Sequence, residues 1–324
     1  MKGDQNWPLI TFGVVAFNQE RFVREAVEGA LAQTYSPLEI ILSDDHSSDG
    51  TWSIVQEMAA KYRGPHRLIL NRNPVNLGIG AHVNAVLSLA NGELFVGAAG
   101  DDVSYPNRTE LVYRAWEHSN RQATAITSHV KKIDDRGCEI GKVKARIDEQ
   151  SRRLLHRARY GCWNVFGCSQ AWHRKVFETF GPLRDYVVAE DRSMEFRCWA
   201  LGSVVMVDEY LVQYRVHGSN VSAQGEGVPE EEKKRGYARN LKVQYAMLRQ
   251  FLVDLDRIEM LNLHPVTEIQ LARQAIVRNL GANLLEQKYL QAVPAHQVAL
   301  GLNALVSINP KTGLKWILRS LHLR

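Results

Sequence analysis

Four apolar runs, each followed by a polar loop, alternate with helical patterns over the first hundred residues of this 324-residue chain. The strand-like runs are residues 9–17, 38–42, 67–70 and 94–99, and the helical patterns are residues 22–31, 51–62 and 79–90. Strand, helix and strand in succession form the right-handed crossover unit of a parallel sheet. The sequence therefore predicts an α/β fold with an open, mainly parallel twisted sheet flanked by helices.

Polar side chains follow each strand-like run. They are Asn18, the pair Asp44-Asp45, residues 71–76, and the pair Asp101-Asp102. The carboxyl ends of parallel strands share one edge of the sheet, where open α/β folds bind ligands. Two carboxylates can hold a divalent cation, which in turn binds a diphosphate. A solvated turn is the alternative for Asp101-Asp102, and Ser48 or Asp49 is expected to cap the helix beginning at Thr51.

Two common nucleotide-binding classes lack their motifs in this chain. A nicotinamide-binding fold needs a Gly-x-Gly-x-x-Gly turn after the first strand, where this sequence has Phe17-Asn18-Gln19-Glu20. Gly78-Ile79-Gly80 occurs later without the third glycine, and no Gly-Lys-Ser/Thr phosphate loop is present. Hydride transfer and P-loop hydrolysis are therefore disfavoured.

The formal charge of +5 and the pI near 9.0 suit an anionic ligand or an anionic membrane surface. We expect no nucleic-acid partner, because no recognised binding motif accompanies the charge. The four cysteines, Cys138, Cys162, Cys168 and Cys198, lack metal-ligand spacing and are expected to be reduced residues of a cytoplasmic protein. No apolar run reaches the length of about 18 residues that a membrane span needs.

Residues 10–222 resemble the family 2 glycosyltransferases, which have a nucleotide-sugar-binding GT-A fold. The resemblance rests on an ordered set of short segments, none of which is specific alone. They are Val14-Val15-Ala16-Phe17-Asn18, Ala32-Gln33-Thr34-Tyr35, residues 38–51, Asn76-Leu77-Gly78-Ile79-Gly80-Ala81, the Asp101-Asp102 loop, Ala189-Glu190-Asp191 and residues 214–222. Family members often have Asp-x-Asp-Asp at the fourth strand, and here Ala99 replaces the first aspartate.

The resemblance implies a nucleotide-sugar site at the sheet edge. Asp45 would accept a ring N–H of uracil or thymine, which adenine and cytosine lack, although guanine also has one. Asp102 would bind Mn²⁺ or Mg²⁺, and Asp101 would contact the ribose or share the metal. His217 would be a late metal ligand or a diphosphate contact, with a structural hydrogen-bonded histidine as the alternative. The remaining donor-binding residues implied are Ala16, Phe17, Asn18, Asn76 and Gly78, with core packing as the alternative for Phe17.

The same resemblance makes Asp191 the general base that deprotonates the acceptor, with inversion at the anomeric carbon. Glu190 would orient the acceptor or cap the helix. The alternative for both acids is favourable placement at the N-terminus of the helix that residues 192–201 predict.

Outside these segments the sequence leaves several alternatives open. The basic run at residues 151–159 is a solvated face or a site for a phosphorylated acceptor. Tyr160, Trp163 and Trp172 are stacking platforms for sugars or core residues. Residues 223–232 are expected to form a linker, and residues 237–290 have helical periodicity, with Leu241, Tyr245, Leu248 and Leu252 on one stripe.

We therefore expect a catalytic domain over residues 1–225 and a helical region over residues 226–324. The last residues, 310–324, place Leu314, Ile317, Leu318 and Leu321 opposite basic residues. Such a helix lies on a membrane surface, docks on its own helical domain, or contacts a second subunit in a homo-oligomer.

The sequence thus predicts a metal-dependent inverting glycosyltransferase of surface polysaccharide synthesis, at the cytoplasmic face of a membrane. Its donor would be a UDP- or dTDP-linked sugar and its acceptor a saccharide or lipid-linked saccharide. The alternative is a catalytically silent subunit that binds a nucleotide sugar or glycan on the same fold. A sugar-nucleotide pyrophosphorylase is less favoured, because its glycine-rich basic first loop is absent.

Overall fold

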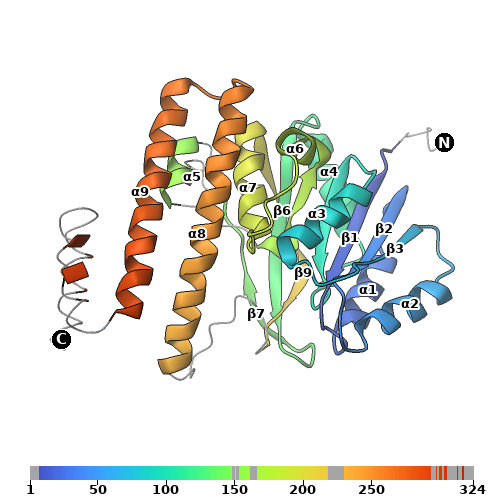
Figure 1. Cartoon of the computed structure of the whole chain (residues 1–324). Coiled ribbons are helices and arrows are strands. Elements are labelled where there is room, and N and C mark those ends of the chain that lie inside the picture. The colour runs from blue at the N-terminus through green and yellow to red at the C-terminus, as the bar shows by residue number, and fades with distance from the viewer. Residues whose placement is uncertain are drawn as a thin grey trace. The chain divides into compact units, whose positions relative to one another are not determined.

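The chain folds into two units (Figure 1). The computed structural model in that figure describes residues 7–147, 150, 153–160, 166–217, 230–292, 297, 299, 300, 303, 304, 312 and 316. The first unit comprises Met1–Arg152 and Cys162–Ala223, and the second comprises Arg153–Gly161 and Gln224–Arg324. The short stretch Arg153–Gly161 thus interrupts the first unit in sequence.

Four parallel strands form one half of the sheet in the first unit. They are β1 (Ile10–Ala16), β2 (Leu38–Asp44), β3 (Arg67–Arg72) and β4 (Leu94–Ala99), in the spatial order β3-β2-β1-β4. Ala16 pairs with Asp44, Asp44 with Arg72, and Val15 with Ala99. This register places the carboxyl ends of all four strands at one edge, as the sequence predicts.

The other half of the sheet is mixed. It continues from β4 through β8 (Ala171–His173), β6 (Ala123–Ile133), β9 (Ser203–Arg215) and β5 (Val103–Ser104), with β7 (Glu139–Val143) paired to β6. Strand β8 runs antiparallel to β4 and β6, whereas β9 runs parallel to β6. The 3₁₀ turn Gly167–Ser169 leads into β8. The half of the sheet that carries the polar loops is therefore wholly parallel, whereas the other half contains both strand directions.

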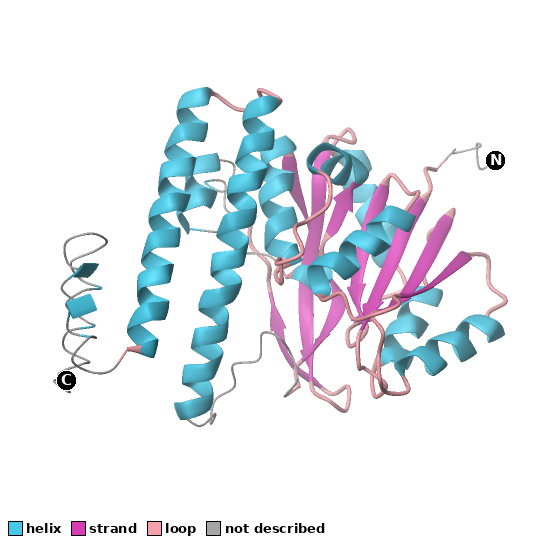
Figure 2. Cartoon of the chain, in the orientation of Figure 1, coloured by secondary structure: helices cyan, strands magenta, loops and turns pink. Residues whose placement is uncertain are grey.

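Helices cover both faces of this sheet (Figure 2). Helices α1 (Val23–Leu31), α2 (Thr51–Lys61) and α4 (Arg108–His118) contribute to one apolar core, and α3 (Ile79–Leu89), α6 (Arg174–Phe180) and α7 (Glu190–Leu201) contribute to the other. Successive strand side chains point to opposite faces, so Ile40 lies in the first core and Ile41 in the second. Burial on both faces explains why the strands are continuous apolar runs.

The cap of α2 differs from the sequence prediction. Gly50 occupies the N-cap position, and not Ser48 or Asp49. The Asp49 carboxylate nevertheless accepts the Thr51 N–H at 3.0 Å, because a turn places it beside the first helical residue. Asp49 therefore supports the helix start without standing at the cap itself.

The second unit is helical in its described part. It contains α5 (Leu154–Tyr160), α8 (Glu230–Met260) and α9 (Val266–Gln291), and α9 packs against both of the others. The Asn283 side chain donates to the Leu241 carbonyl of α8 at 3.0 Å, and the Leu154 N–H of α5 donates to Glu268 at 2.8 Å. No described helix is long and apolar enough to cross a membrane.

Burial identifies Trp172 as a core residue and bears on two further alternatives left open by the sequence. Arg157 of α5 is buried, so the basic run is not a uniformly solvated face. Trp172 is a core residue whose ring stacks on Phe95 with ring centroids 5.8 Å apart, whereas Tyr160 is exposed. Trp163 and the stripe residues of 310–324 lie outside the described residues. Trp316 belongs to the described residues, and its buried ring stacks on Tyr289 with ring centroids 4.8 Å apart.

Candidate active site

The loops after β1 and β2 are tied together at the carboxyl edge of the sheet. The Ser47 hydroxyl accepts the Asn18 N–H at 2.8 Å, and the Asn18 side-chain oxygen accepts the Ser48 N–H at 2.9 Å. Asn18 has a φ of 51°, a left-handed conformation in which asparagine is enriched. Ala16 is buried, whereas Phe17 is 45% exposed and therefore does not pack in the core. Its ring is accessible to a ligand at this edge.

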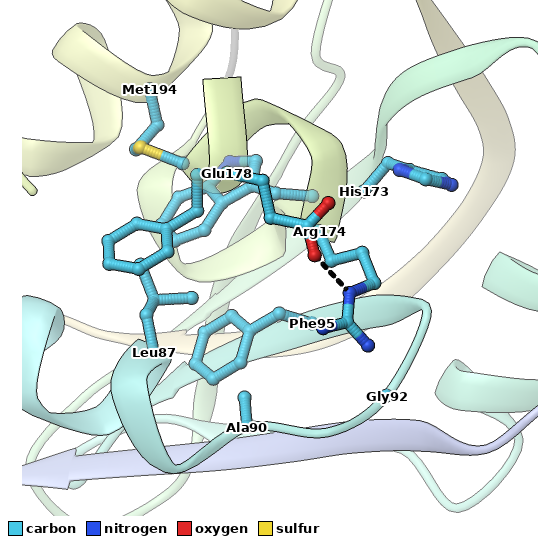
Figure 3. A pocket seen from close by; sticks show the side chains of 10 residues that line it. Leu87, Ala90, Gly92, Phe95, His173, Arg174, Glu178 and Met194 are labelled. Atoms are coloured by element: carbon cyan, nitrogen blue, oxygen red, sulfur yellow. Dashed lines mark hydrogen bonds and ion pairs between the residues drawn. The ribbon is translucent and has the colours of Figure 1, made fainter. Parts of the chain in front are cut away.

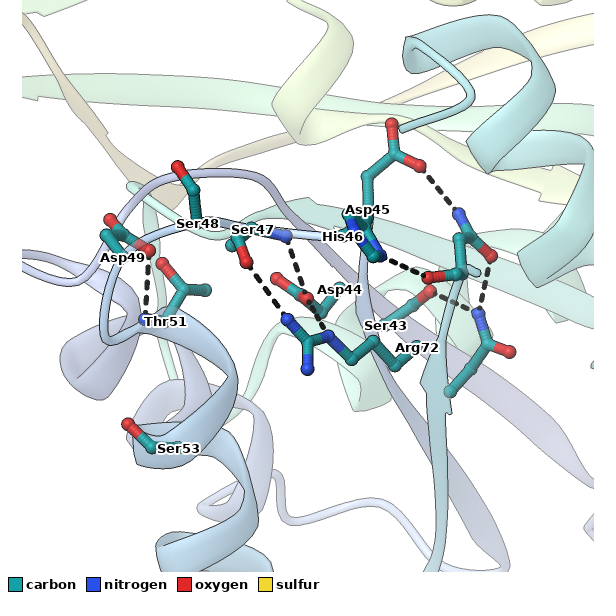
Figure 4. Close-up of polar contacts among 12 residues, drawn as sticks. Ser43, Asp44, Asp45, His46, Ser47, Ser48, Asp49, Thr51, Ser53 and Arg72 are labelled. Atoms are coloured by element: carbon teal, nitrogen blue, oxygen red, sulfur yellow. Dashed lines mark hydrogen bonds and ion pairs between the residues drawn. The ribbon is translucent and has the colours of Figure 1, made fainter. Parts of the chain in front are cut away.

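Asp45 follows β2 and binds the loop after β3 (Figure 4). Its carboxylate accepts the Asn73 side-chain amide at 2.7 Å and the N–H groups of Leu77 and Gly78 at 2.9 Å each. The Asn76 side chain accepts the same Gly78 N–H at 3.0 Å. Asp45 is only 2% exposed. A carboxylate has about four acceptor positions, and these bonds use two on Oδ1 and one on Oδ2.

Asp44, the neighbour of Asp45, has a structural role. Its Oδ2 accepts the Arg72 guanidinium at 3.2 Å and the Ser47 N–H at 3.0 Å (Figure 4). The carboxylate is buried, and these bonds fix the β2–α2 loop to the end of β3. Asp44 thereby stabilises the loop that carries Asp45.

Asp101, Asp102 and His217 come together after β4 and β9. Asp102 is buried, and its Oδ1 accepts the Arg215 N–H at 2.8 Å. Burial and the Asp101 charge raise the pKa of Asp102 to about 8. The Asp101 Oδ2 lies 3.0 Å from His217 Nε2, and the His217 ring packs on Phe22 with centroids 4.8 Å apart. The structure therefore places the three predicted metal or ribose residues in one cluster.

Arg215 holds this cluster in place, a role that the sequence did not reveal. Its buried guanidinium donates to the Asp101 carbonyl at 2.9 Å, the Asp134 carbonyl at 3.1 Å and the Glu25 carboxylate at 2.8 Å. It also lies over the Phe22 ring at 4.8 Å. The sequence contained one indication of this role: Arg215 belongs to the matching segment of residues 214–222, two positions before His217.

Glu190 and Asp191 form the first turn of α7 and are partly buried. Burial and the adjacent Asp191 charge raise the pKa of Glu190 to about 8. Burial also raises the pKa of Asp191, although the Arg192 charge opposes the shift. The Asp191 carboxylate accepts the Arg192 N–H at 2.8 Å. A carboxyl whose pKa is raised toward neutrality is suited to exchange a proton at working pH.

The turn Gly167–Ser169 contacts both β4 and α7. Burial and the Asp102 charge raise the pKa of the Cys168 thiol well above its usual value. The Gly167 Cα is so close to Asp191 that a Cβ there would come within 2.7 Å of the carboxylate Oδ2. Neither Gly167 nor Cys168 was predicted, because a single glycine or cysteine has no local pattern.

Close backbone contacts join these groups at the sheet edge. The Ala16 carbonyl accepts the Asp45 N–H at 2.9 Å, and a Cβ on Gly100 would come within 2.8 Å of the Ala16 Cβ. A Cβ on Gly80, in the first turn of α3, would meet the Val187 carbonyl of the loop before α7. These contacts join the loops after β1, β2 and β4 at this edge of the sheet, and they join the start of α3 to the loop before α7.

A small pocket elsewhere in the first unit is separate from this region (Figure 3). Leu87, Phe95 and Met194 contribute apolar side chains to its lining, and Arg174 pairs with Glu178 at its edge at 2.7 Å. Phe95 lies near the beginning of β4, whereas the Asp101-Asp102 pair follows the strand's end. The pocket is therefore at the opposite end of the sheet from the predicted site.

Asp101, Asp102 and His217 would hold a divalent cation only together with ligands from a bound diphosphate or water. Among the described residues, no three His, Cys, Asp or Glu side chains are placed to hold a metal by themselves. The two carboxylates are hard oxygen donors, and His217 adds an imidazole suited to Mn²⁺. A bound cation would oppose the effects of burial and of the Asp101 charge, which together raise the pKa of Asp102. Diphosphate oxygens and water would supply its remaining ligands.

Relatives of this chain include glycosyltransferases of bacteria. A chain of Haemophilus influenzae described as an uncharacterized glycosyltransferase is 28% identical over 226 residues, covering 68% of this chain and 69% of the relative. An uncharacterized protein of Mycobacterium tuberculosis, Rv1520, is 43% identical over 212 residues, covering 64% of this chain and 58% of the relative. This chain therefore spans under two thirds of the mycobacterial relative.

Solved structures of similar fold bind nucleotides or nucleotide sugars. Staphylococcus aureus TarS 1-349 in complex with UDP has a TM-score of 0.56 at 16% identity, covering 97% of this chain and 90% of TarS. The mannosyltransferase PcManGT of Pyrobaculum calidifontis, in complex with GDP-Man and Mn²⁺, has a TM-score of 0.50 at 17% identity, covering 97% and 84%. These likenesses confirm the GT-A fold. Residues 11–181 match the family described as Glycosyl transferase family 2, so the chain belongs to that glycosyltransferase family.

Proposed function

We propose that this chain is an inverting glycosyltransferase that uses a nucleoside diphosphate sugar, with UDP- and dTDP-linked donors preferred. The acceptor is a hydroxyl group of a glycan or lipid-linked saccharide. The observation that carries the proposal is the gathering of Asp45, the Asp101-Asp102 pair and the loop before α7 at one edge of the sheet. Glycosyl transfer needs one group for the leaving diphosphate and another for the acceptor proton, side by side.

Donor binding is assigned to the loops that follow β1, β2 and β3. The exposed Phe17 ring supplies an apolar surface for the base, and Asn18, Asn76 and Gly78 border it. Asp45 supplies the acceptor position that remains on Oδ2. TarS with UDP-GlcNAc and the mannosyltransferase with GDP-Man support a nucleotide sugar as the ligand class.

The diphosphate is assigned to the Asp101-Asp102 cluster. Asp102 and His217 would hold Mn²⁺ or Mg²⁺, and Asp101 would share the cation or contact the ribose. The bound cation would neutralise charge on the leaving diphosphate. Arg215 maintains the geometry of the cluster by binding the Asp101 carbonyl and the Asp102 carboxylate.

Asp191 acts on the acceptor. Its carboxylate takes the proton of the acceptor hydroxyl while that oxygen attacks the anomeric carbon from the face opposite the diphosphate. The carbon–oxygen bond to the diphosphate breaks, and the nucleoside diphosphate leaves with the electron pair. Direct displacement inverts the anomeric configuration. The raised pKa of Asp191 brings its basicity closer to that of an efficient proton acceptor. A positioned general base typically contributes about 10²–10⁴-fold to the rate.

The membrane and acceptor assignments are part of the same proposal. A basic chain that acts on a lipid-linked saccharide at the cytoplasmic face, in surface polysaccharide synthesis, would approach an anionic surface. The burial of Trp316 against Tyr289 supports docking of residues 310–324 on the helical unit. Contact with a membrane or with a second subunit is the alternative for that segment.

The second candidate function is a catalytically silent subunit that binds a nucleotide sugar or glycan. Asp45, Asp102 and Asp191 together favour the enzyme, since binding alone needs no partly buried base beside the diphosphate site. Turnover distinguishes the two functions, because a silent subunit would bind the donor and release no nucleoside diphosphate.

Thermal melting against nucleotide sugars, with and without Mn²⁺, tests the proposal. A ligand at about 100 times its Kd adds roughly 2.7 kcal/mol to the free energy of unfolding, or about 5–10 °C in Tm. We expect uridine and thymidine diphosphates to stabilise the protein more than adenosine and cytidine diphosphates. Equal stabilisation by ADP and UDP would contradict the role of Asp45.

A further inference from the structure

A series of hydrogen-bonded polar side chains lies behind Asp45, between the ends of β2 and β3 (Figure 4). Ser43 of β2 and Asn71 of β3 are paired in the sheet, and the Asn71 amide donates to the Ser43 hydroxyl at 2.9 Å. The same amide nitrogen donates to the Asn73 side-chain oxygen at 3.1 Å. The Asn73 amide in turn donates to Asp45 Oδ1 at 2.7 Å. The series therefore ends on the carboxylate that is assigned to the base.

His82 of α3 closes the series at its other end. Ser43 points to the same face of the sheet as Ile41, two residues earlier in β2, and Ile41 belongs to the core to which α3 contributes. The His82 Nε2 lies 2.6 Å from the Ser43 hydroxyl on this face. Ser43, His82 and Asn73 are all buried. Their hydrogen bonds are therefore made within the protein and are little exchanged with water.

The donors and acceptors of this series have one consistent direction. Asn71 donates to both Ser43 and Asn73, so the Asn73 oxygen faces Asn71 and the Asn73 nitrogen is left for Asp45. Among the described residues, the Ser43 hydroxyl has two partners, and because it accepts from Asn71, its own hydrogen is directed to His82 Nε2. His82 accepts that hydrogen in its neutral form. Burial favours this form by lowering the pKa of His82, although the neighbouring aspartate charges oppose the shift.

The Asn73 amide determines which acceptor positions of Asp45 are occupied. Together with the Leu77 N–H at 2.9 Å, it fills both positions on Oδ1. The Gly78 N–H takes one position on Oδ2, also at 2.9 Å. A reversed Asn73 amide would instead direct its oxygen at the carboxylate, where two acceptors repel each other. The direction of the series therefore fixes the orientation of the Asp45 side chain.

We propose that the polar side chains behind Asp45 act as a hydrogen-bond relay that sets the preference for a base with a ring N–H. The relay consists of His82, Ser43, Asn71 and Asn73. This inference rests on the proposed function, in which Asp45 contacts the base. With Oδ1 filled, the carboxylate meets the base through Oδ2 alone, as an acceptor. The N3–H of uracil satisfies that acceptor, whereas the N3 lone pair of cytosine opposes it. The relay members are positioning residues, because they act through Asp45.

Calorimetric titration of the full chain with UDP and with CDP, in the presence of Mn²⁺, tests the relay. A hydrogen bond to a charged acceptor corresponds to about 10–150-fold in affinity, and we expect the wild type to prefer UDP by a factor in that range. Asn73→Leu keeps the approximate size of the side chain and removes the donor to Oδ1, so the UDP-to-CDP affinity ratio should fall about 10-fold. His82→Phe should lower this ratio about 3–10-fold, because the Ser43 hydrogen is no longer directed away from Asn71. His82→Gln should restore the ratio, since its amide oxygen can accept the Ser43 hydrogen.

His66→Phe is the matched control. His66 is also buried, its Nε2 lies 2.8 Å from the Gln33 carbonyl, and it precedes β3 at the end of the strand opposite to Asn71. This variant should leave the UDP-to-CDP ratio unchanged.

A purely structural role would lower the affinities for UDP and CDP equally. An unchanged ratio in Asn73→Leu or in His82→Phe would therefore overturn the inference. If Asn73→Leu does not fold, an unchanged ratio in His82→Phe, or failure of His82→Gln to restore it, overturns the inference. Equal affinities of the wild-type protein for UDP and CDP would instead refute the donor preference of the proposed function, and the relay's role with it.

Discussion

Replacing Arg215 by methionine removes the guanidinium beneath the Asp101-Asp102 cluster and keeps most of the apolar stem. In the native protein this guanidinium donates to the carbonyls of Asp101 and Asp134 and to the Glu25 carboxylate, at 2.9, 3.1 and 2.8 Å. The methionine side chain can still pack on the Phe22 ring, which lies 4.8 Å from the guanidinium. The substitution therefore tests the polar contacts more than the packing.

The expected cost follows from the exposure of each partner. Each carbonyl that loses its donor costs about 1–3 kcal/mol, and we take the lower half of that range because both bonds are only partly buried. The Glu25 side chain is 50% exposed, so its ion pair contributes about 0–1 kcal/mol. The free energy of unfolding should fall by about 2–5 kcal/mol, and Tm by roughly 4–20 °C.

Urea denaturation followed by circular dichroism measures this loss, and Mn²⁺ titration of donor binding measures its effect on the site. Arg24→Met is the matched control, since Arg24 forms an exposed ion pair with Glu57 and should change stability by less than about 0.5 kcal/mol. We expect Arg215→Met to need more Mn²⁺ than wild type for donor binding. A loss below about 1 kcal/mol with unchanged Mn²⁺ dependence would refute the positioning role.

Three further predictions follow from the buried groups. The folded protein keeps a proton on Glu190 up to about pH 8, whereas the unfolded chain loses it above about pH 4.5, so the free energy of unfolding falls as pH rises through that window. Glu190→Gln should therefore flatten the pH dependence of the urea midpoint. Equal slopes for the variant and the wild type would contradict this prediction. Trp316→Ala should lower stability by about 3–5 kcal/mol, because Trp316 is buried on Tyr289. If instead the full chain sediments with anionic vesicles and a version ending at Asn309 does not, residues 310–324 bind a membrane. Asp102→Ala should make donor binding independent of Mn²⁺, and wild-type transfer unchanged by excess chelator would exclude the metal role.

The sheet and its ligand edge could be predicted because their patterns are local. Residues 94–99 form β4 with the predicted bounds, since an apolar run buried on both faces has few other conformations. Parallel pairing then brings the residues after β2 and β4, Asp45 and the Asp101-Asp102 pair, to the same edge. Chain order and strand direction were sufficient for this part of the site.

Contacts between distant segments could not be predicted in the same way. Arg215 meets Asp101, and Gly167 meets Asp191, across long separations in sequence. The need for glycine at position 167 becomes visible only when the Asp191 carboxylate is placed. Similarly, the family resemblance predicts that Asp45 contacts the base, but the bonds of Asp45 to the loop after β3 depend on tertiary structure.

The helical region shows how a usable local pattern was missed. Residues 237–290 have continuous helical periodicity, yet α8 ends at Met260 and α9 begins at Val266. Asn262 adopts a left-handed φ of 52°, and Pro265 stands at the N-cap of α9. Proline inside a helical pattern marks a boundary, so the break was predictable from Pro265.

The turnover of Asp191→Asn tests the central claim most directly. Asparagine keeps the size and shape of the side chain but cannot take the acceptor proton. The full-chain variant should bind the donor as wild type does, with the same donor-induced rise in Tm, while release of nucleoside diphosphate falls about 10²–10⁴-fold. Turnover near the wild-type rate would remove Asp191 from the mechanism and contradict the assignment of an inverting transferase to this site.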